Sequence, residues 1–325
     1  MVTDAAIDRS GDGAYDVRDN VAKNMQGTVR LGFIGTGKVG SAFGIRLAER
    51  GYQVAGCMDI KPQEALRFAT AIPGCCIYAS QQALADASDV VFITVPDDDI
   101  EPVASSLEWR PPQTVVHCSG ANTVGILQKA SSVGAPVGVI HPLNTFASLQ
   151  QSLENLVGGH FTLEADEPAL SLLVQMATDL EGDYAVLEAK NKALYHASGI
   201  FSCNYVYTIV AIAVGLFEHF GLKQEDALLA LTTLLRGTIN NIENVGYPGC
   251  LTGPIARGDI PPWRHICGRS MRRPHSLCLC ARRSAGGRCR LPLRRERCLK
   301  WMDEPLSTCS QTSSRHRRDL AAESV

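Results

Sequence analysis

Short apolar runs alternate with amphipathic segments over residues 29–188 of the chain. The runs are rich in β-branched residues and predict strands of a buried parallel sheet, whereas segments with apolar residues three and four positions apart predict helices. The predicted strands cover residues 29–34, 52–59, 76–78, 89–96, 114–118, 136–140, 160–164 and 184–187. The predicted helices cover residues 41–50, 62–70, 80–87, 100–107 and 168–180. This alternation predicts an α/β domain with a doubly wound sheet of eight strands.

After Glu188 the pattern changes to long helices. Residues 189–220 are predicted to form one helix of about 48 Å, at ~1.5 Å per residue. Apolar residues lie on all sides of this helix, so we expect it at the centre of an all-helical C-terminal domain. Lys192, His196 and Asn204 interrupt its first half, and the apolar run after them is too short to span a membrane. A second predicted helix, residues 224–245, carries a stripe that predicts a core, made of Leu228, Leu231, Leu235, Ile239 and Ile242.

A glycine-rich turn joins the first predicted strand to the first predicted helix. Gly35 permits a tight turn, Gly37 lets backbone amides approach a pyrophosphate, and Gly40 lets the helix pack closely on the sheet. The free amides and the dipole at the helix N-terminus favour phosphate groups. The sequence therefore predicts a Rossmann-type domain that binds NAD or NADP, and a glycine-rich turn without a ligand is the alternative. The predicted cofactor residues of the turn are Gly35, Thr36, Gly37, Lys38, Val39 and Gly40.

Acidic residues follow two of the predicted strands. Asp59 lies 19 residues after Gly40, where an acid commonly hydrogen-bonds the ribose 2′-hydroxyl of NAD. Lys61 instead suits the 2′-phosphate of NADP, so both cofactors stay open, and Asp59 could also cap a turn or helix. Asp97–Asp99 are predicted to cap the next helix by accepting its free N–H groups.

Ligands of a doubly wound sheet bind at the carboxyl ends of its strands, and several candidate residues lie there. Val95 and Pro96 end one strand, Ser119 follows the next, and we expect all three at the cofactor site. Two successive strands end near histidines. We expect His117 to be structural and His141 to face the nicotinamide side of the cleft.

Composition narrows the function classes. The 325 residues are 45% hydrophobic, enough for two domains with a large core, and the net charge of −2 gives no reason to expect nucleic acid. The 12 cysteines include no metal-binding spacing in the first 260 residues, so we expect no metal site and a reducing, cytoplasmic location. Residues 1–28 are polar without an apolar segment, and we expect a disordered leader rather than a signal peptide or anchor.

The tail after Ile260 contradicts the pattern before it. Residues 261–325 hold 14 Arg and one Lys against five acidic residues, without helical or strand periodicity. Codons exist for Pro261–His275 that, read two bases later, encode the amphipathic segment Thr-Val-Ala-Ala-His-Leu-Arg-Ala-Leu-Asp-Ala-Ala-Ala-Pro. We therefore interpret the tail as frame-shifted and disordered. A basic nucleic-acid-binding extension is the alternative, but it lacks interleaved aromatic residues.

The predicted domains are a leader (1–28), a dinucleotide-binding Rossmann domain (29–188), a helical substrate and dimerisation domain (189–260) and the aberrant tail (261–325). Over about residues 30–260 the chain resembles Rossmann-like proteins with a C-terminal DUF2520 domain, which are relatives of pyrroline-5-carboxylate reductase and the β-hydroxyacid dehydrogenases and are described as NADP oxidoreductases. The matching motifs are Leu31–Gly40, Val95–Asp98, Val116–Ala121, His141–Leu143 with Phe146, Lys192–Ala197, Asn204–Tyr205 and Leu251–Asp259. Two departures are Asp59, where relatives often carry Ser followed by Arg, and the missing last helices after Ile260.

The resemblance implies a proton-transfer group on the long helix. A helical lysine and a nearby asparagine serve β-hydroxyacid dehydrogenases, which makes Lys192 and Asn204 candidate catalytic residues, with His196 as a competitor. Lys192 and His196 are four residues apart and share a helix face, with Tyr195 beside them, and Asn204 is rotated by about 80° from His196. The alternative is that Lys192 and His196 only hydrogen-bond across the domain interface.

Substrate binding is assigned to a second group of residues. Thr252 and Gly253 are predicted to start a short helix whose amides, with Arg257, hold a substrate carboxylate. His141 and Tyr195 complete the predicted substrate site. The sequence thus predicts an NAD(P)-dependent oxidoreductase that transfers a hydride to or from a small carboxylated imine, ketone or hydroxy acid, without nucleic-acid or membrane partners. The resemblance implies a homodimer through the helical domain, provided that this domain folds. A non-catalytic dinucleotide sensor and an inactive truncated gene product are the alternatives.

Overall fold

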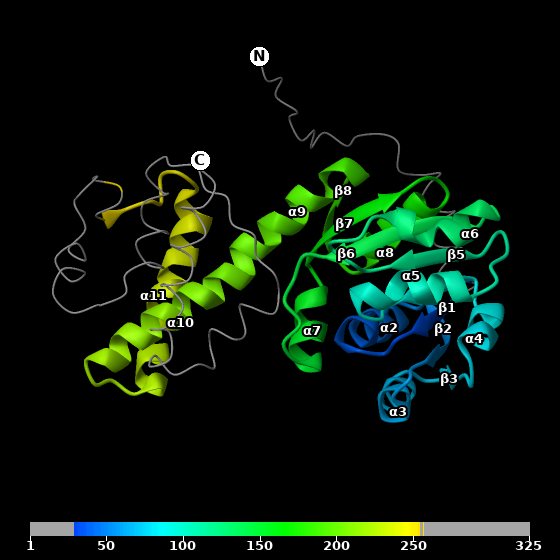
Figure 1. Cartoon of the computed structure of the whole chain (residues 1–325), viewed down its shortest axis with the longest axis horizontal. Helices are drawn as coiled ribbons and strands as arrows, with labels where there is room; N and C mark the ends of the chain where they lie inside the picture. Colours follow the sequence, from blue (N-terminus) through cyan, green and yellow to red (C-terminus); the bar gives the residue numbers. More distant parts are fainter. Residues whose placement is uncertain (1–28, 254–255, 257–325) are drawn as a thin grey trace, which may run out of the picture. The chain divides into compact units, whose positions relative to one another are not determined.

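The central feature of the computed structural model, which describes residues 29–253 and residue 256, is one eight-stranded sheet (Figure 1). The strand order is β3-β2-β1-β4-β5-β6-β7-β8, and neighbours are parallel except for the antiparallel pair β6 and β7. The doubly wound α/β fold predicted from the sequence is confirmed. The strands are β1 (Arg30–Ile34), β2 (Gln53–Met58), β3 (Cys76–Ile77), β4 (Val90–Ile93), β5 (Thr114–His117), β6 (Val137–Pro142), β7 (His160–Ala165) and β8 (Asp183–Val186).

Helices cover both faces of this sheet, which explains why its inner strands are apolar on both sides, whereas the edge strands β3 and β8 are exposed (Figure 1). On one face Phe43 of α2 and Phe68 of α3 pack with Phe33 and Phe92 of the sheet. α7 and α8 extend the same core, and the opposite core lies under α4, α5 and α6. The helices are α2 (Lys38–Glu49), α3 (Pro62–Ala71), α4 (Gln81–Ala87), α5 (Asp97–Ser106), α6 (Gln128–Ser132), α7 (Leu149–Leu156) and α8 (Ala169–Asp179).

Three short elements and one helix start differ from the sequence-based expectation. The 3-10 turn η1 (Val124–Leu127), α6 and α7 were not predicted, because segments this short show little periodicity. Asp97–Asp99 do not cap α5. The helix begins at Asp97 after an N-cap at Pro96, so the three carboxylates occupy the first turn, where their charges still favour the helix dipole.

After β8 the chain forms one continuous helix over Ala189–His219, as predicted. It consists of the 3-10 turn η2 (Ala189–Asn191), α9 (Lys192–Gly199), the π-helical segment η3 (Ile200–Asn204) and α10 (Tyr205–His219). α11 (Gln224–Val245) comes next. The π-helical segment was not predicted, because it changes the number of residues per turn without interrupting the helix.

The predicted burial of these helices is wrong for the described residues. Leu194 is 73% exposed and Ile209 is 62% exposed. The predicted core stripe of α11 is also partly open to solvent, since Ile239 and Ile242 are exposed. The physical reason is that the described part of the chain places no further apolar layer over these faces. Their periodicity therefore reflects a surface that the described residues leave uncovered.

The chain divides into two compact units at residues 232 and 233, inside α11. Of the described residues, 29–232 belong to the first unit, and 233–253 with 256 belong to the second. The domain boundary expected at residue 188 and the domain ranges built on it stay predictions. The predicted leader, the tail after Ile260 and Arg257 lie outside the described residues.

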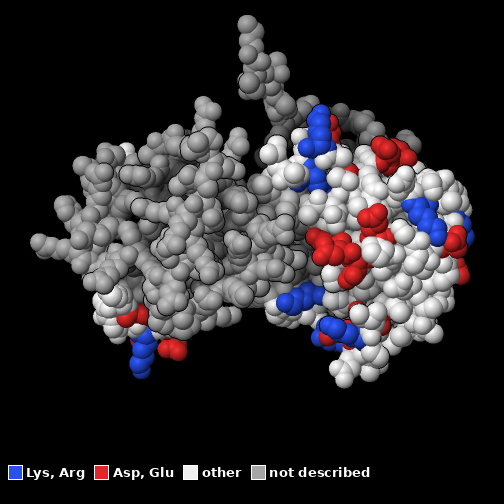
Figure 2. Space-filling model, in the orientation of Figure 1, with Lys and Arg blue, Asp and Glu red and all other residues white. Residues whose placement is uncertain are grey.

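Two surface features bear on the expected partners. Among the described residues on the face in Figure 2, Lys and Arg side chains are scattered between acidic ones and form no continuous stripe. The helical run Ala189–His219 is long and apolar enough, by length and composition alone, to cross a membrane. Its first turn carries Lys192, which is buried against β7 rather than turned to the outside. The expected absence of nucleic-acid and membrane partners stays a prediction.

His117 is the histidine that the sheet encloses completely. Its Nδ1 accepts a hydrogen bond from the Ser119 amide at 3.1 Å, and its Nε2 lies 3.1 Å from the Thr123 carbonyl oxygen. Both ring nitrogens therefore have partners only when Nε2 carries the proton and the ring is neutral. Burial lowers the pKa of His117 to about 4, and the charge of Lys192 acts in the same direction. The expectation that His117 is structural agrees with this geometry.

The low pKa of His117 predicts an acid-dependent loss of stability. The unfolded imidazole binds a proton near pH 6.5, whereas the folded one does so only near pH 4. Between these values the unfolded state holds more protons, so the free energy of unfolding falls as the pH drops, by about 3 kcal/mol in total from this group. Urea unfolding at pH 7, 5.5 and 4.5 measures the fall, and His117→Gln should make it shallower.

His160→Gln is the matched control, because His160 is exposed on β7. This variant should keep the pH dependence of the parent chain. If His117→Gln does not fold, proton NMR of the imidazole in the unaltered chain gives the pKa directly. A His117 ring that titrates near pH 6.5 would contradict the prediction.

Candidate functional site

A cavity of about 730 Å³ lies at the carboxyl ends of β1, β2 and β4. Its wall includes the glycine-rich turn, the segment after β2, one side of α3, the segment after β4 and part of α5. Seven of the predicted cofactor residues line it, namely Gly35, Gly37, Lys38, Asp59, Lys61, Val95 and Pro96.

The glycine-rich turn is built so that backbone amides face this cavity. Gly35 has φ of 91°, and a Cβ there would lie 2.9 Å from the Thr94 carbonyl group, so both conformation and space require glycine. A Cβ on Gly37 would meet no atom within 4 Å, because that position opens onto the cavity. Gly37 is the N-cap of α2, no side chain caps this helix, and its first turn holds no acidic residue. The amides there are consequently available to an anion.

Other residues of the turn support it from behind. Gly40 packs against the sheet, where an added Cβ would lie 2.4 Å from the Gly35 carbonyl oxygen. Thr36 is buried and Val39 is partly buried, and neither lines the cavity. Ser119 is not brought to the cavity either. Its Oγ accepts hydrogen bonds from the amides of Ala121 and Asn122, at 3.2 and 3.0 Å, and holds a turn together.

Asp59 fastens the end of β2 to the glycine-rich turn. Its Oδ2 accepts hydrogen bonds from the Thr36 amide at 2.6 Å and the Thr36 hydroxyl at 2.9 Å. Its Oδ1 accepts one from the Lys61 amide at 2.8 Å. The carboxylate thus lines the cavity and also has internal partners. Lys61 and Arg67 bring positive charge to the same wall, with Arg67 ion-paired to Glu64.

A smaller cavity of about 360 Å³ lies between the segment after β6 and the helix α9. His141 Nδ1 and the Tyr195 hydroxyl oxygen are hydrogen-bonded at 2.6 Å beside it. Burial and the nearby charge of Lys192 lower the pKa of His141 to about 4, so its ring is neutral. An added Cβ on Gly120 would lie 2.6 Å from His141 Nε2, which explains why a glycine stands opposite this ring. His196 and Asn204 line the same cavity.

The π-helical segment explains how Asn204 reaches this wall. In a regular α-helix Asn204 would be rotated by about 80° from His196. A π-helical turn holds more residues, so each residue between Ile200 and Asn204 advances the rotation by less than in an α-helix. Both side chains then face one cavity. This correction to the predicted geometry could not be read from helical spacing.

Lys192 is separated from His196, although they are four residues apart. Its side chain is 2% exposed, and Nζ lies 3.4 Å from Oε2 of Glu164 on β7. Glu164 is 5% exposed, and its Oε1 accepts a hydrogen bond from the Val124 amide at 2.9 Å. Burial lowers the pKa of Lys192, and the Glu164 carboxylate opposes this shift. His196 is instead exposed and lines the smaller cavity.

Sequence reasoning missed Glu164. Its signal was a charged residue inside the run His160–Ala165, which otherwise alternates buried apolar and small polar side chains. A carboxylate in a buried strand is rarely present without a paired charge.

Thr252 and Gly253 lie in the second unit, whose placement against the first is not described. Within residues 29–253 and 256, no three His, Cys, Asp or Glu side chains form a candidate metal site.

Two family models match the chain in succession. A Rossmann-like domain matches residues 16–142, and a domain of unknown function, DUF2520, matches residues 159–264. No curated protein sequence gives a significant match. The first match covers the glycine-rich turn and the strands β1–β6, and the second covers Glu164, Lys192 and the helices after them.

Solved structures share this fold at low sequence identity. A Bacteroides fragilis protein named as a candidate NADP oxidoreductase is 17% identical, with a TM-score of 0.61 over 80% of this chain and 96% of its own. A Thermotoga maritima protein is 24% identical, with a TM-score of 0.61 over 78% and 95%. A reductive aminase from Aspergillus terreus, in complex with NADPH, is 15% identical, with a TM-score of 0.54 over 84% and 91%. With both domains matched in order, the chain belongs to the Rossmann-like proteins that carry a C-terminal DUF2520 domain.

Proposed function

We propose that this protein is an NAD(P)-dependent oxidoreductase that transfers a hydride between the nicotinamide and a small carboxylated imine, ketone or hydroxy acid. The observation that carries the proposal is the 730 Å³ cavity at the open N-terminus of α2, with Gly37 placed where any side chain would enter it. Similar folds in an NADPH-bound reductive aminase and in a Streptococcus pyogenes 1-pyrroline-5-carboxylate reductase support the reaction class.

The residues of the cavity fit a dinucleotide. The turn Gly35–Lys38 would hold the pyrophosphate through its amides, and Val95 and Pro96 would line the path toward the nicotinamide. Lys61 and Arg67 suit the 2′-phosphate of NADP, whereas Asp59 suits a ribose hydroxyl of NAD. The bound cofactor would supply or accept the hydride, and the protein has to supply or accept a proton.

Lys192 is the proposed proton donor and acceptor. Burial lowers its pKa and so brings the amine closer to the pH at which it can exchange a proton with substrate. His196 and Asn204, on the smaller cavity with His141 and Tyr195, are proposed to contact the substrate and to compete for the same role. Thr252, Gly253 and Arg257 remain the proposed carboxylate-binding group.

A second candidate function is a non-catalytic dinucleotide sensor. The observation that favours it is the enclosure of Lys192, which lines neither the 730 Å³ cavity nor the 360 Å³ cavity. An ion pair in such a position can serve structure alone. Under this alternative the protein binds cofactor tightly and turns over no substrate.

Substitution of Gly37 tests the cofactor site. Gly37→Ala adds a methyl group that touches nothing in the protein, so the melting temperature should not change, while NADPH and NADH affinity should fall by about tenfold or more because the methyl blocks the pyrophosphate. Fluorescence titration with each cofactor measures this. Gly215→Ala in α10 is the control, since its Cβ also meets no atom within 4 Å. Unchanged affinity in Gly37→Ala would exclude this turn as the binding site.

Lys192→Met separates the enzyme from the sensor. The apolar chain fills the same space, so cofactor affinity should stay within about twofold, and kcat should fall by roughly 10²-fold or more because a proton-transfer group is lost. The assay follows NADPH consumption with a panel of small carboxylated imines and ketones. If several substrates react and kcat of Lys192→Met is unaltered, Lys192 is not the proton donor.

We further infer that the protein forms a homodimer through α9, η3 and α10. Their large apolar residues are exposed in the single chain, among them Leu194, Phe201, Tyr207 and Ile209. An apolar surface of this kind is covered in most soluble proteins. Sedimentation equilibrium should give twice the mass of one chain. Ile209→Asp should shift the equilibrium to monomer, while Leu66→Asp, on the exposed side of α3, should not.

A further inference from the structure

Lys192 has no direct route to solvent in the described structure. Its side chain is 2% exposed and lines neither the cofactor cavity nor the smaller cavity beside His141. Three groups besides Glu164 interact with its charge, namely His117 and Cys118 at the end of β5 and His141 at the end of β6. Both histidines are neutral. A proton donated by Lys192 therefore has to be replaced through one of its close neighbours.

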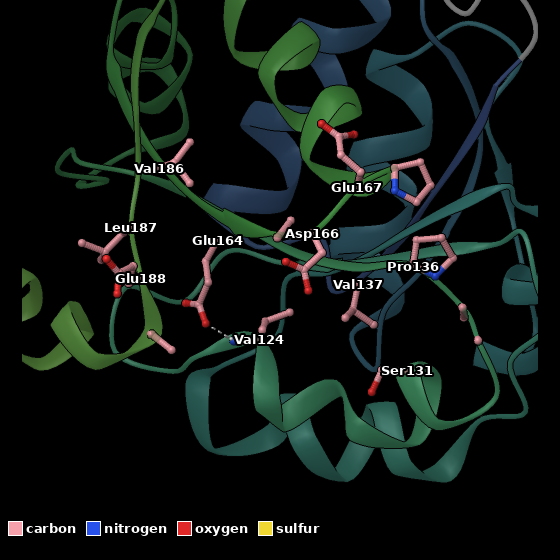
Figure 3. A pocket seen from close by; sticks show the side chains of 15 residues that line it. Val124, Ser131, Pro136, Val137, Glu164, Asp166, Glu167, Val186, Leu187 and Glu188 are labelled. Atoms are coloured by element: carbon pink, nitrogen blue, oxygen red, sulfur yellow. Dashed lines mark hydrogen bonds between the residues drawn. The ribbon is translucent and has the colours of Figure 1, made fainter. Parts of the chain in front are cut away.

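Glu164 is the neighbour that reaches solvent. It lies in the wall of a third cavity of about 660 Å³, which is bordered by α6 and by the carboxyl ends of β7 and β8 (Figure 3). The Val124 amide holds Oε1 in place, and Oε2 lies 3.4 Å from Lys192 Nζ. One carboxylate thus borders the cavity and faces the buried amine.

The cavity is acidic from its rim to its inner end. Asp166 and Glu167 are exposed around it, Glu188 is exposed and ion-paired with Lys190, and Glu164 is the buried member of the set (Figure 3). Several carboxylates around one opening create a negative potential, which raises the local concentration of cations, protons included. The cavity therefore favours delivery of protons to Glu164.

The contacts of the pair leave room for transfer. Lys192 Nζ and Glu164 Oε2 face each other as an ion pair at 3.4 Å, and among the described residues neither atom has a hydrogen bond within normal geometry. Buried polar atoms without partners are rare and call for a specific explanation. A separation of 3.4 Å becomes a hydrogen bond after a small side-chain rotation.

We propose that Glu164 carries protons between solvent in the acidic cavity and the amine of Lys192, an inference that rests on the role of Lys192 in the proposed function. When the Lys192 ammonium gives a proton to the substrate, a neutral amine remains. Glu164 takes up a proton from an acid in the cavity, and its carboxyl group then turns so that the acidic hydrogen faces Nζ. Transfer of that proton to Nζ restores the ammonium and the carboxylate. For substrate oxidation the proton moves in the opposite direction.

The first test measures proton exchange and needs no substrate. In protein labelled with ¹⁵N and ¹³C in lysine, NMR gives the exchange rate of the Lys192 Nζ hydrogens with water. The rate should rise with the concentration of a small acid such as formate buffer, and Glu164→Gln should lower it by about tenfold or more. Glu167→Gln is the matched control, because it makes the same change at the rim of the cavity and should leave the rate unchanged. Equal rates in the parent chain and Glu164→Gln overturn the proposal.

A second variant covers the case in which Glu164→Gln does not fold. Val186→Trp places a large side chain at the exposed rim of the cavity and leaves the pair itself intact. It should slow the exchange of Lys192 and abolish its dependence on formate. If exchange is as fast in this variant as in the parent chain, protons reach Lys192 by another route and the proposal is wrong.

Turnover distinguishes failure of the relay from failure of the proposed function. With a working substrate, Glu164→Gln should lower kcat with little change in KM, and formate should partly restore kcat, which a purely structural role would not allow. Turnover that is unaffected by Glu164→Gln overturns the relay and leaves the oxidoreductase standing. Exchange that depends on Glu164 in a protein without any turnover supports the relay and overturns the oxidoreductase.

Discussion

The candidate cofactor site depends on the close approach of α2 to the ends of β1 and β4. The Thr94 hydroxyl donates a hydrogen bond to the Gly35 carbonyl oxygen at 2.6 Å, and Gly40 brings the first turn of the helix against both residues. A side chain at either glycine would push the helix away from the sheet. Since Gly35 and Gly40 have no side chains, the direction of the free amides is set by the path of the backbone and not by rotamers of the turn.

The buried polar cluster around Lys192 follows a second constraint, the cost of enclosing charge. One ammonium and one carboxylate lie inside the protein, and both nearby histidines stay neutral, so the cluster carries no net charge. A buried ion pair at 3.4 Å without hydrogen bonds stabilises a fold poorly compared with apolar side chains of the same volume. Its position, with Glu164 in the wall of the 660 Å³ cavity, is the one that the proposed proton transfer requires.

The sheet could be predicted almost completely because its central strands β1, β4 and β5 are buried and read as apolar runs, although the edge strands β3 and β8 are exposed. The glycine-rich turn could also be predicted, because Gly35 and Gly37 meet local requirements of backbone conformation and space. The Lys192 and Glu164 pair could not be predicted, because it joins two residues 28 positions apart, one on α9 and one on β7, that meet only in the folded chain. The phase of Asn204 was missed for another reason: a π-helical segment changes rotation without changing the polarity pattern.

The helical region shows what a periodic pattern can and cannot establish. An apolar stripe indicates that a face is covered, but it does not say whether the same chain provides the cover. The sheet region supplies its own two cores, whereas Phe201, Tyr207 and Ile209 are exposed in the single chain. The same continuous helix carries Lys192 and Tyr195. A partner that covers the apolar part of this helix would restrict its motion. Association would therefore be coupled to the geometry of the candidate proton-transfer site.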